Sequence, residues 1–140
     1  MNIAKKFSLP KDFQNYIQKN TPLYLCDFIT IFSSLKREEE ANIFTQIEYI
    51  LEDLQYLKNQ DKEYYKFELY PQKNGLLPFG VSDNGDYLFW QVCSKESNKW
   101  KVAILPSRSN EVEILDESFL SFIKKLENKE LVCNSFPKLF

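Results

Sequence analysis

Proton transfer near neutral pH most often uses histidine, and this sequence of 140 residues contains none. Catalytic systems in which a histidine activates serine or cysteine are therefore excluded. An enzyme would have to rely on carboxylate or lysine chemistry, for instance among Glu68, Asp83 and Asp86. No paired acids stand at a spacing that is diagnostic of such chemistry. The residues therefore argue against an enzyme and leave carboxylate or lysine chemistry as the one alternative.

The segment from Gly75 to Gly80 has the glycine spacing of a phosphate-binding loop but lacks the chemistry of one. Val81 stands where a lysine must neutralise phosphate charge, and Pro78 removes one backbone amide donor. A strand, rather than the N-terminus of a helix, is expected to follow. The sequence therefore predicts no nucleotide cofactor here.

Two other motifs match the first two of penicillin-recognising enzymes: Ser33 to Lys36 reads Ser-x-x-Lys, and Ser82 to Asn84 reads Ser-Asp-Asn. The third motif, Lys-Thr-Gly, is absent, and its nearest counterpart at 73–75 precedes the second motif instead of following it. Chance explains the match better. Ser33 or Ser34 would then help to start a long helix.

The run Asp83-Asn84-Gly85-Asp86 has the look of a calcium loop, but no carboxylate occupies the position of the bidentate glutamate of an EF-hand. A tight hairpin turn explains the same residues, because Asn84-Gly85 tolerates positive φ. The cysteines are odd in number and form no Cys-x-x-Cys pair, so we expect small buried side chains and no metal site. They are Cys26, Cys93 and Cys133.

Composition bounds the class of protein. Hydrophobic residues make up 44% and aromatic residues 16%, which indicates an ordered domain, predicted to span residues 1–140. The net charge of −2 argues against a nucleic-acid surface. Residues 1–10 contain no apolar signal core and the longest apolar run, 23–32, is too short for a membrane span, so we expect a cytoplasmic protein.

Hydrophobic periodicity predicts three helices, at about 10–19, at 38–58 with Glu38, Glu39 and Glu40 in its first turn, and a last one capped by Asp116 or Ser118. Strands are predicted at 24–32, 65–70, 86–92, 100–105 and 112–115, although 24–32 also fits helical spacing. Helices at both ends with strands between them indicate a single α+β domain. We expect a mostly antiparallel sheet packed with N-terminal, central and C-terminal helices.

All three glycines lie within 75–85, which indicates left-handed or crowded backbone at that place. These residues, together with the segments around them, resemble the SUKH superfamily (Smi/Knr-like domain). The resemblance rests on 67–71 (FELYP), 75–80 (GLLPFG), 84–86 (NGD) and 89–90 (FW), and also takes in LPxDF near the N-terminus, Trp100 and the 118–123 helix. The extended 38–58 helix does not align securely to the family pattern.

The SUKH superfamily includes yeast cell-wall regulators and bacterial immunity proteins that bind and neutralise toxins. The resemblance implies an α+β fold that acts by protein binding, with no catalytic residue and no obligate cofactor. The partner expected first is a polymorphic toxin, for instance a nuclease; the alternative is a cellular protein bound by an intracellular adaptor or regulator of the same fold. The motif residues expected to be structural are Gly75, Leu77, Pro78, Phe79, Gly80, Gly85, Phe89 and Trp90.

Two regions are candidates for partner binding. Asp83, Asn84 and Asp86 could face a partner from their turn, or serve the turn alone. A helical projection places Thr45, Tyr49, Glu52 and Tyr56 opposite the apolar stripe of the long helix, where tyrosines suit an interface unless they lie against a neighbouring strand. Acids could steer a basic toxin toward this helix. These acids are Glu38, Glu39, Glu40, Glu48, Glu52 and Asp53.

Overall fold

The computed structural model describes residues 9–19, 23–33 and 42–137. Within these residues the chain forms helices α2 (Lys11–Lys19), α3 (Ile43–Gln60) and α4 (Phe119–Glu127) and a short 3-10 turn at Ser97–Lys99. Its strands are β1 (Tyr24–Leu25), β2 (Ile29–Ile31), β3 (Gly75–Ser82), β4 (Tyr87–Val92), β5 (Lys101–Leu105) and β6 (Glu113–Ile114).

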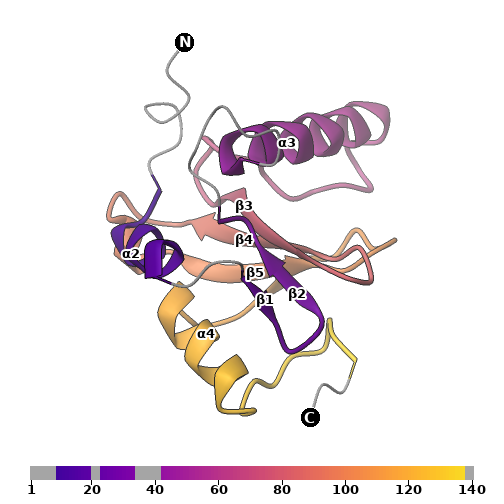
Figure 1. Ribbon diagram of the computed structural model, residues 1–140. Helices are drawn as coiled ribbons and strands as arrows, with labels where there is room; N and C mark the ends of the chain where they lie inside the picture. The colour runs from indigo at the N-terminus through magenta and orange to yellow at the C-terminus, as the bar shows by residue number, and fades with distance from the viewer. Residues whose placement is uncertain (1–8, 20–22, 34–41, 138–140) are drawn as a thin grey trace.

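The six strands form one sheet in the order of the sequence, β1-β2-β3-β4-β5-β6, and each neighbouring pair is antiparallel. Helix α3 covers one face of the sheet, whereas α2 and α4 lie together on the other (Figure 1). The predicted α+β domain with a mostly antiparallel sheet is therefore confirmed. None of the helices in the described part of the chain has the length and hydropathy of a membrane crossing.

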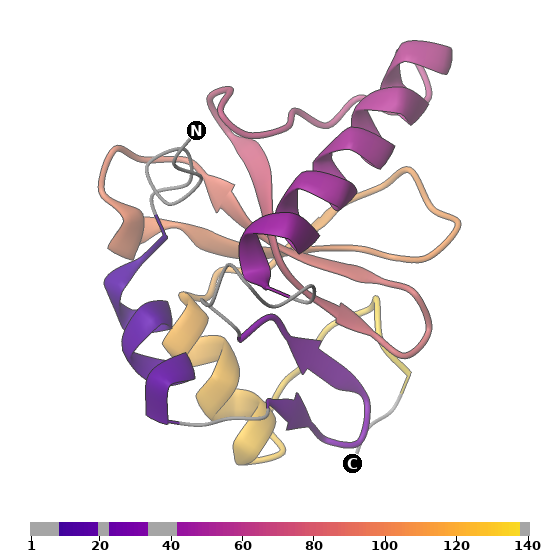
Figure 2. The same cartoon turned by 45° about the horizontal axis from the view of Figure 1, so that its top comes forward.

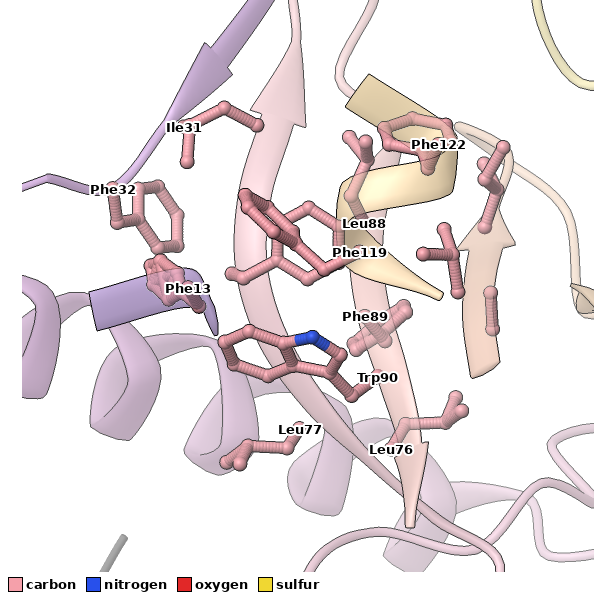
Figure 3. Packing of buried hydrophobic residues seen from close by; sticks show 14 of the residues in the cluster. Phe13, Ile31, Phe32, Leu76, Leu77, Leu88, Phe89, Trp90, Phe119 and Phe122 are labelled. Atoms are coloured by element: carbon pink, nitrogen blue, oxygen red, sulfur yellow. The ribbon is translucent and has the colours of Figure 1, made fainter. Parts of the chain in front are cut away.

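An aromatic cluster joins the sheet to α2 and α4 (Figure 3). The ring of Phe13 in α2 lies 4.8 Å from Trp90 in β4 and 5.1 Å from Phe119 in α4. The ring of Phe79 in β3 lies 4.9 Å from Trp90 and 5.3 Å from Phe119. These four aromatic residues are at most 1% exposed, and Leu77 and Phe89 are fully buried as well. The prediction that Leu77, Phe79, Phe89 and Trp90 belong to the core is therefore confirmed.

Only the end of β3, after Gly80, was predicted as a strand. Pro78 and two glycines argue locally against a strand in the rest of it. Pro78 lies outside the part of β3 that pairs with β2, and the pairing with β4 shifts register between Pro78 and Gly80. Its missing N–H therefore removes no hydrogen bond to β2. The proline is tolerated in an interior strand for this reason, and the register shift beside it is a β-bulge in the pairing with β4.

The glycines occupy positions where a side chain would not fit. A Cβ on Gly80 would stand 2.7 Å from the backbone oxygen of Thr30 in β2, and a Cβ on Gly75 would stand 2.6 Å from the backbone of Leu69. Gly85 has a φ of +86° in the β3–β4 turn. The expectation of left-handed or crowded backbone in this segment is confirmed.

The predicted strand at 24–32 is wrong, because it is a hairpin of two short strands. Cys26 and Asp27 have φ of 57° and 50°, and the N–H of Phe28 donates to the carbonyl of Leu25 at 3.0 Å. Positive φ at both central residues is the geometry of a tight hairpin turn. The pair Cys26-Asp27 lacks the glycine that usually signals such a turn in a sequence. Cys26 is exposed in this turn rather than buried, whereas Cys93 and Cys133 are half-buried.

The predicted strand at 65–70 is also absent. Of these residues only Leu69 forms a bridge, and its partner Leu76 lies just beyond a tight loop. The carbonyl of Glu68 accepts from the N–H of Leu76, and the N–H of Tyr70 donates to the carbonyl of Leu76. The alternating sequence therefore lies alongside the start of β3 without joining the sheet.

The N-caps of α3 and α4 can now be assigned. Asn42 has extended backbone and its Oδ1 accepts from the N–H of Thr45 at 2.9 Å, so α3 begins at Ile43 and Asn42, not Ser33 or Ser34, is its N-cap. The glutamates at 38–40 lie outside the described residues. Ser118 rather than Asp116 caps α4, where its Oγ accepts from the N–H of Ser121 at 3.2 Å. The other predicted elements are confirmed within a few residues.

Candidate protein-binding surfaces

The outer side of α3 presents polar and aromatic residues to solvent. Its inner side is buried against the sheet at Ile43, Phe44, Ile47, Ile50 and Leu54. Tyr49 and Tyr56 are 62% and 64% exposed, and Glu52 and Asp53 are exposed beside them. We name Tyr49, Glu52, Asp53 and Tyr56 the helix face. The alternative that the tyrosines lie against a neighbouring strand does not hold at these exposures.

The C-terminal part of α3 projects past the sheet (Figure 2). Leu54 is its last buried residue, so the following six residues continue the helix with little support from the core. Lys58 lies half-buried and is directed at the next segment. Its Nζ donates to the carbonyl of Phe67, lies 3.9 Å from a carboxylate oxygen of Glu68, and stands 5.8 Å from the centre of the Phe67 ring. The positive charge of Lys58 is therefore engaged away from the acids of the helix face.

The β3–β4 turn presents less than the sequence predicts, because Asp86 is only 3% exposed. Its Oδ2 accepts from the hydroxyl of Ser82 at 2.6 Å, and its Oδ1 accepts from the N–H of Ser107 at 2.8 Å. A buried carboxylate needs such donors to offset its lost hydration. Asp86 therefore holds the turn to the β5–β6 loop, so of the two roles left open for it, partner contact or turn support, its burial favours support of the turn.

Asp83 and Asn84 are exposed on the same turn, but Asp83 is partly engaged. The N–H of Asp83 donates to the carbonyl of Phe28 at 2.9 Å, and its carboxylate accepts a hydrogen bond from the hydroxyl of Tyr24. That hydrogen bond is the main cause that raises the pKa of Tyr24 to about 12, with desolvation and the charges of Asp83 and Asp27 adding to it. On this turn the exposed residues that a partner could contact are therefore Asn84 and, in part, Asp83.

Sequence reasoning missed Tyr24, which is 49% exposed and joins the β1–β2 hairpin to this turn. Within the sequence Tyr24 is one of several aromatic residues in an apolar run. Its partner lies 59 positions away, so only the pairing of β2 with β3 brings the two groups together. No local pattern could have identified the contact.

The acids named as a conceivable catalytic set do not meet. Glu68 lies beside the start of β3, where its carbonyl accepts a hydrogen bond from the N–H of Leu76. Asp83 and Asp86 follow the end of the same strand. A strand of that length separates its ends by roughly 20 Å. Among the described residues no group of three His, Cys, Asp or Glu side chains could hold a metal ion.

A comparison with protein-family models gives one match. The model described as SUKH_6, SMI1-KNR4 cell-wall, matches residues 5–123, which takes in most of the chain and ends inside α4. A search of curated proteins and a search of solved structures found no match.

Proposed function

Because this chain belongs to the SUKH (SMI1-KNR4) family, we propose that it is an immunity protein, which binds a cognate toxin in the cytoplasm and neutralises it without catalysis. The family includes immunity-type proteins, and the binding role needs only a surface, not a reacting group. The observation that carries the proposal is the helix face, where two tyrosines stand exposed on a helix whose other side is anchored in the core.

Tyr49 and Tyr56 are suited to be the main contacts. They are seven residues apart on α3, which places them about 10 Å apart along the helix axis. Tyrosine offers a large, rigid contact area with few rotatable bonds, and it is enriched among the residues that dominate binding energy. A helix that is already folded and packed loses little further freedom on binding.

Glu52 and Asp53 give the helix face a negative charge, which favours a basic toxin such as a nuclease. Charges at the edge of an interface mainly raise the association rate and contribute little to the lifetime of the complex. Replacing both acids by lysine should slow association and reduce its dependence on salt. An association rate and salt dependence equal to those of the wild type would remove the steering role.

Co-expression with the product of the adjacent reading frame tests the function. If that frame encodes a toxic domain, we expect this chain to restore growth and to co-purify with the toxin. The Tyr49→Ala/Tyr56→Ala variant should lose both effects, whereas the control Tyr64→Ala, which removes another exposed tyrosine, should keep them. Failure of the wild-type chain to restore growth or to form a complex would contradict the immunity role.

A second candidate function is an intracellular adaptor or regulator that binds a cellular protein through the same surface. The description of the matching family model, SMI1-KNR4 cell-wall, favours this reading. A neighbouring frame for a large secreted protein with a toxic C-terminal domain would favour immunity, and its absence would favour the adaptor.

A further inference from the structure

The residues that follow α4 contact two parts of the sheet that are far apart in sequence. We name residues 131–136 the C-terminal strap. The strap lies beyond the part of the chain that the family model matches, which ends at residue 123. It contacts strand β6 and the β1–β2 hairpin, which are at opposite edges of the sheet.

Glu113 in β6 is the first anchor of the strap. Its carboxylate accepts from the N–H of Asn134 at 2.9 Å, from the N–H of Ser135 at 2.9 Å and from the hydroxyl of Ser135 at 2.5 Å. These donors lie in a segment without regular secondary structure, so Glu113 supplies the acceptor that a neighbouring strand would otherwise provide. Hydrogen bonds to a charged carboxylate are stronger than those between neutral groups.

Phe136 is the second anchor. It is 9% exposed, and its ring packs edge-on against Phe28 with 5.4 Å between ring centres. Phe28 is the last residue of the β1–β2 turn. Ser135 and Phe136 are consecutive, so two neighbouring residues of the strap contact β6 and the β1–β2 turn, which belong to opposite edges of the sheet.

The β3–β4 turn is connected to both anchored elements. The carbonyl of Phe28 accepts from the N–H of Asp83, and Asp86 accepts from the N–H of Ser107 in the loop that leads to β6. Burial raises the pKa of Cys133 in the strap, and the charges of Glu113 and Asp86 add to this rise. The three turns at this end of the sheet therefore share one network with the strap.

We propose that the C-terminal strap holds the β1–β2, β3–β4 and β5–β6 turns together as one unit, and that its release is a local opening that frees these turns while the rest of the sheet stays folded. Proteins open locally in cooperative units, and the units with few buried contacts open at the lowest free energy. The inference does not depend on the proposed function. If a partner uses Asp83 and Asn84, the strap sets how rigid that surface is.

Hydrogen exchange resolved by residue tests the strap, with the amide of Asp83 as the reporter and the amide of Leu76 at the other end of β3 as the reference. In Phe136→Ala and in Glu113→Gln we expect exchange at Asp83 to rise by roughly tenfold or more relative to Leu76. Glu111→Gln, which removes an exposed acid two residues before Glu113, serves as the control and should leave both amides unchanged.

Two results would overturn the proposal. Exchange that rises equally at Asp83 and Leu76 in both variants would show that the strap supports the stability of the whole domain and not a local unit. Exchange that rises only at Asn134 and Ser135 would show that the strap can detach without loosening the turns.

Discussion

The segment from Gly75 to Trp90 and the outer side of α3 both contain large aromatic residues, but their surroundings differ completely. Phe79 and Trp90 are at most 1% exposed and contact rings from two helices, whereas Tyr49 and Tyr56 are more than 60% exposed. The motif that carries the family resemblance thus builds the core of the domain, whereas the outer side of α3 offers an exposed surface. Substitutions in the two regions should have opposite consequences for stability and binding.

The largest loss of stability is expected for Phe79→Ala. The side chain is completely buried among Phe13, Trp90 and Phe119, and its removal leaves a cavity that these rings cannot fill. The free energy of unfolding should fall by about 3–5 kcal/mol. Chemical denaturation followed by tryptophan fluorescence measures it, and a loss below 1 kcal/mol would contradict the packing.

Asp86→Ala should have the next largest effect. The change leaves the buried hydroxyl of Ser82 without its acceptor and releases the N–H of Ser107, which costs about 1–3 kcal/mol. Asp83→Ala in the exposed part of the same turn is the matched control and should cost less. Equal losses of unfolding free energy would show that Asp86 is not the internal support of the turn.

A smaller and pH-dependent effect is expected at the start of α4. Hydrogen bonds from Lys125 and then from Ser121 lower the pKa of Glu117 below its ordinary value. Because the pKa in the folded state is the lower one, the contribution to stability is present above the ordinary pKa and is lost as pH falls through the folded pKa. Lys125 is 43% exposed, so Glu117→Gln should cost no more than about 1 kcal/mol at pH 7.

Unfolding of the wild type and of Glu117→Gln at pH 7 and near pH 3 measures this contribution. The difference between the two proteins should narrow at the lower pH. A difference that stays constant with pH would show that the carboxylate is not stabilised by its charge.

Loss of the Asp83 acceptor should change a titration rather than the fold. In Asp83→Asn the pKa of Tyr24 should fall from about 12 toward the ordinary value for tyrosine, because the charged acceptor that favours the protonated phenol is gone. Ultraviolet or NMR titration of the tyrosines measures the shift. An unchanged titration would show that the β1–β2 hairpin is not fastened to the turn through this pair.

The parts of the fold that could be predicted are those in which local sequence and tertiary context agree. The apolar stripe of α3 and the exposure of Tyr49 and Tyr56 follow from helical periodicity, because the helix packs on one side only. Strand β3 could not be predicted in full, since Pro78 and the glycines contradict a strand until the register shift and the close approach of Thr30 are known.

The candidate sites show the same division. Asp83 and Asp86 are equally polar in the sequence, but Asp86 is the one that is buried, where it accepts hydrogen bonds from Ser82 and from Ser107, 21 residues later. Tyr24 and the strap residue Phe136 depend likewise on contacts across the sheet. Long-range pairing, which no local pattern encodes, therefore separates supporting residues from those that remain available to a partner.

The most direct test of the account is calorimetric titration of the partner recovered by co-expression into the Tyr49→Ser/Tyr56→Ser variant. We expect its unfolding midpoint to match that of the wild type and its Kd to weaken by about 30-fold or more, the change that corresponds to loss of a dominant contact. A variant that keeps the wild-type fold and also the wild-type Kd would contradict the claim that α3 presents the binding surface.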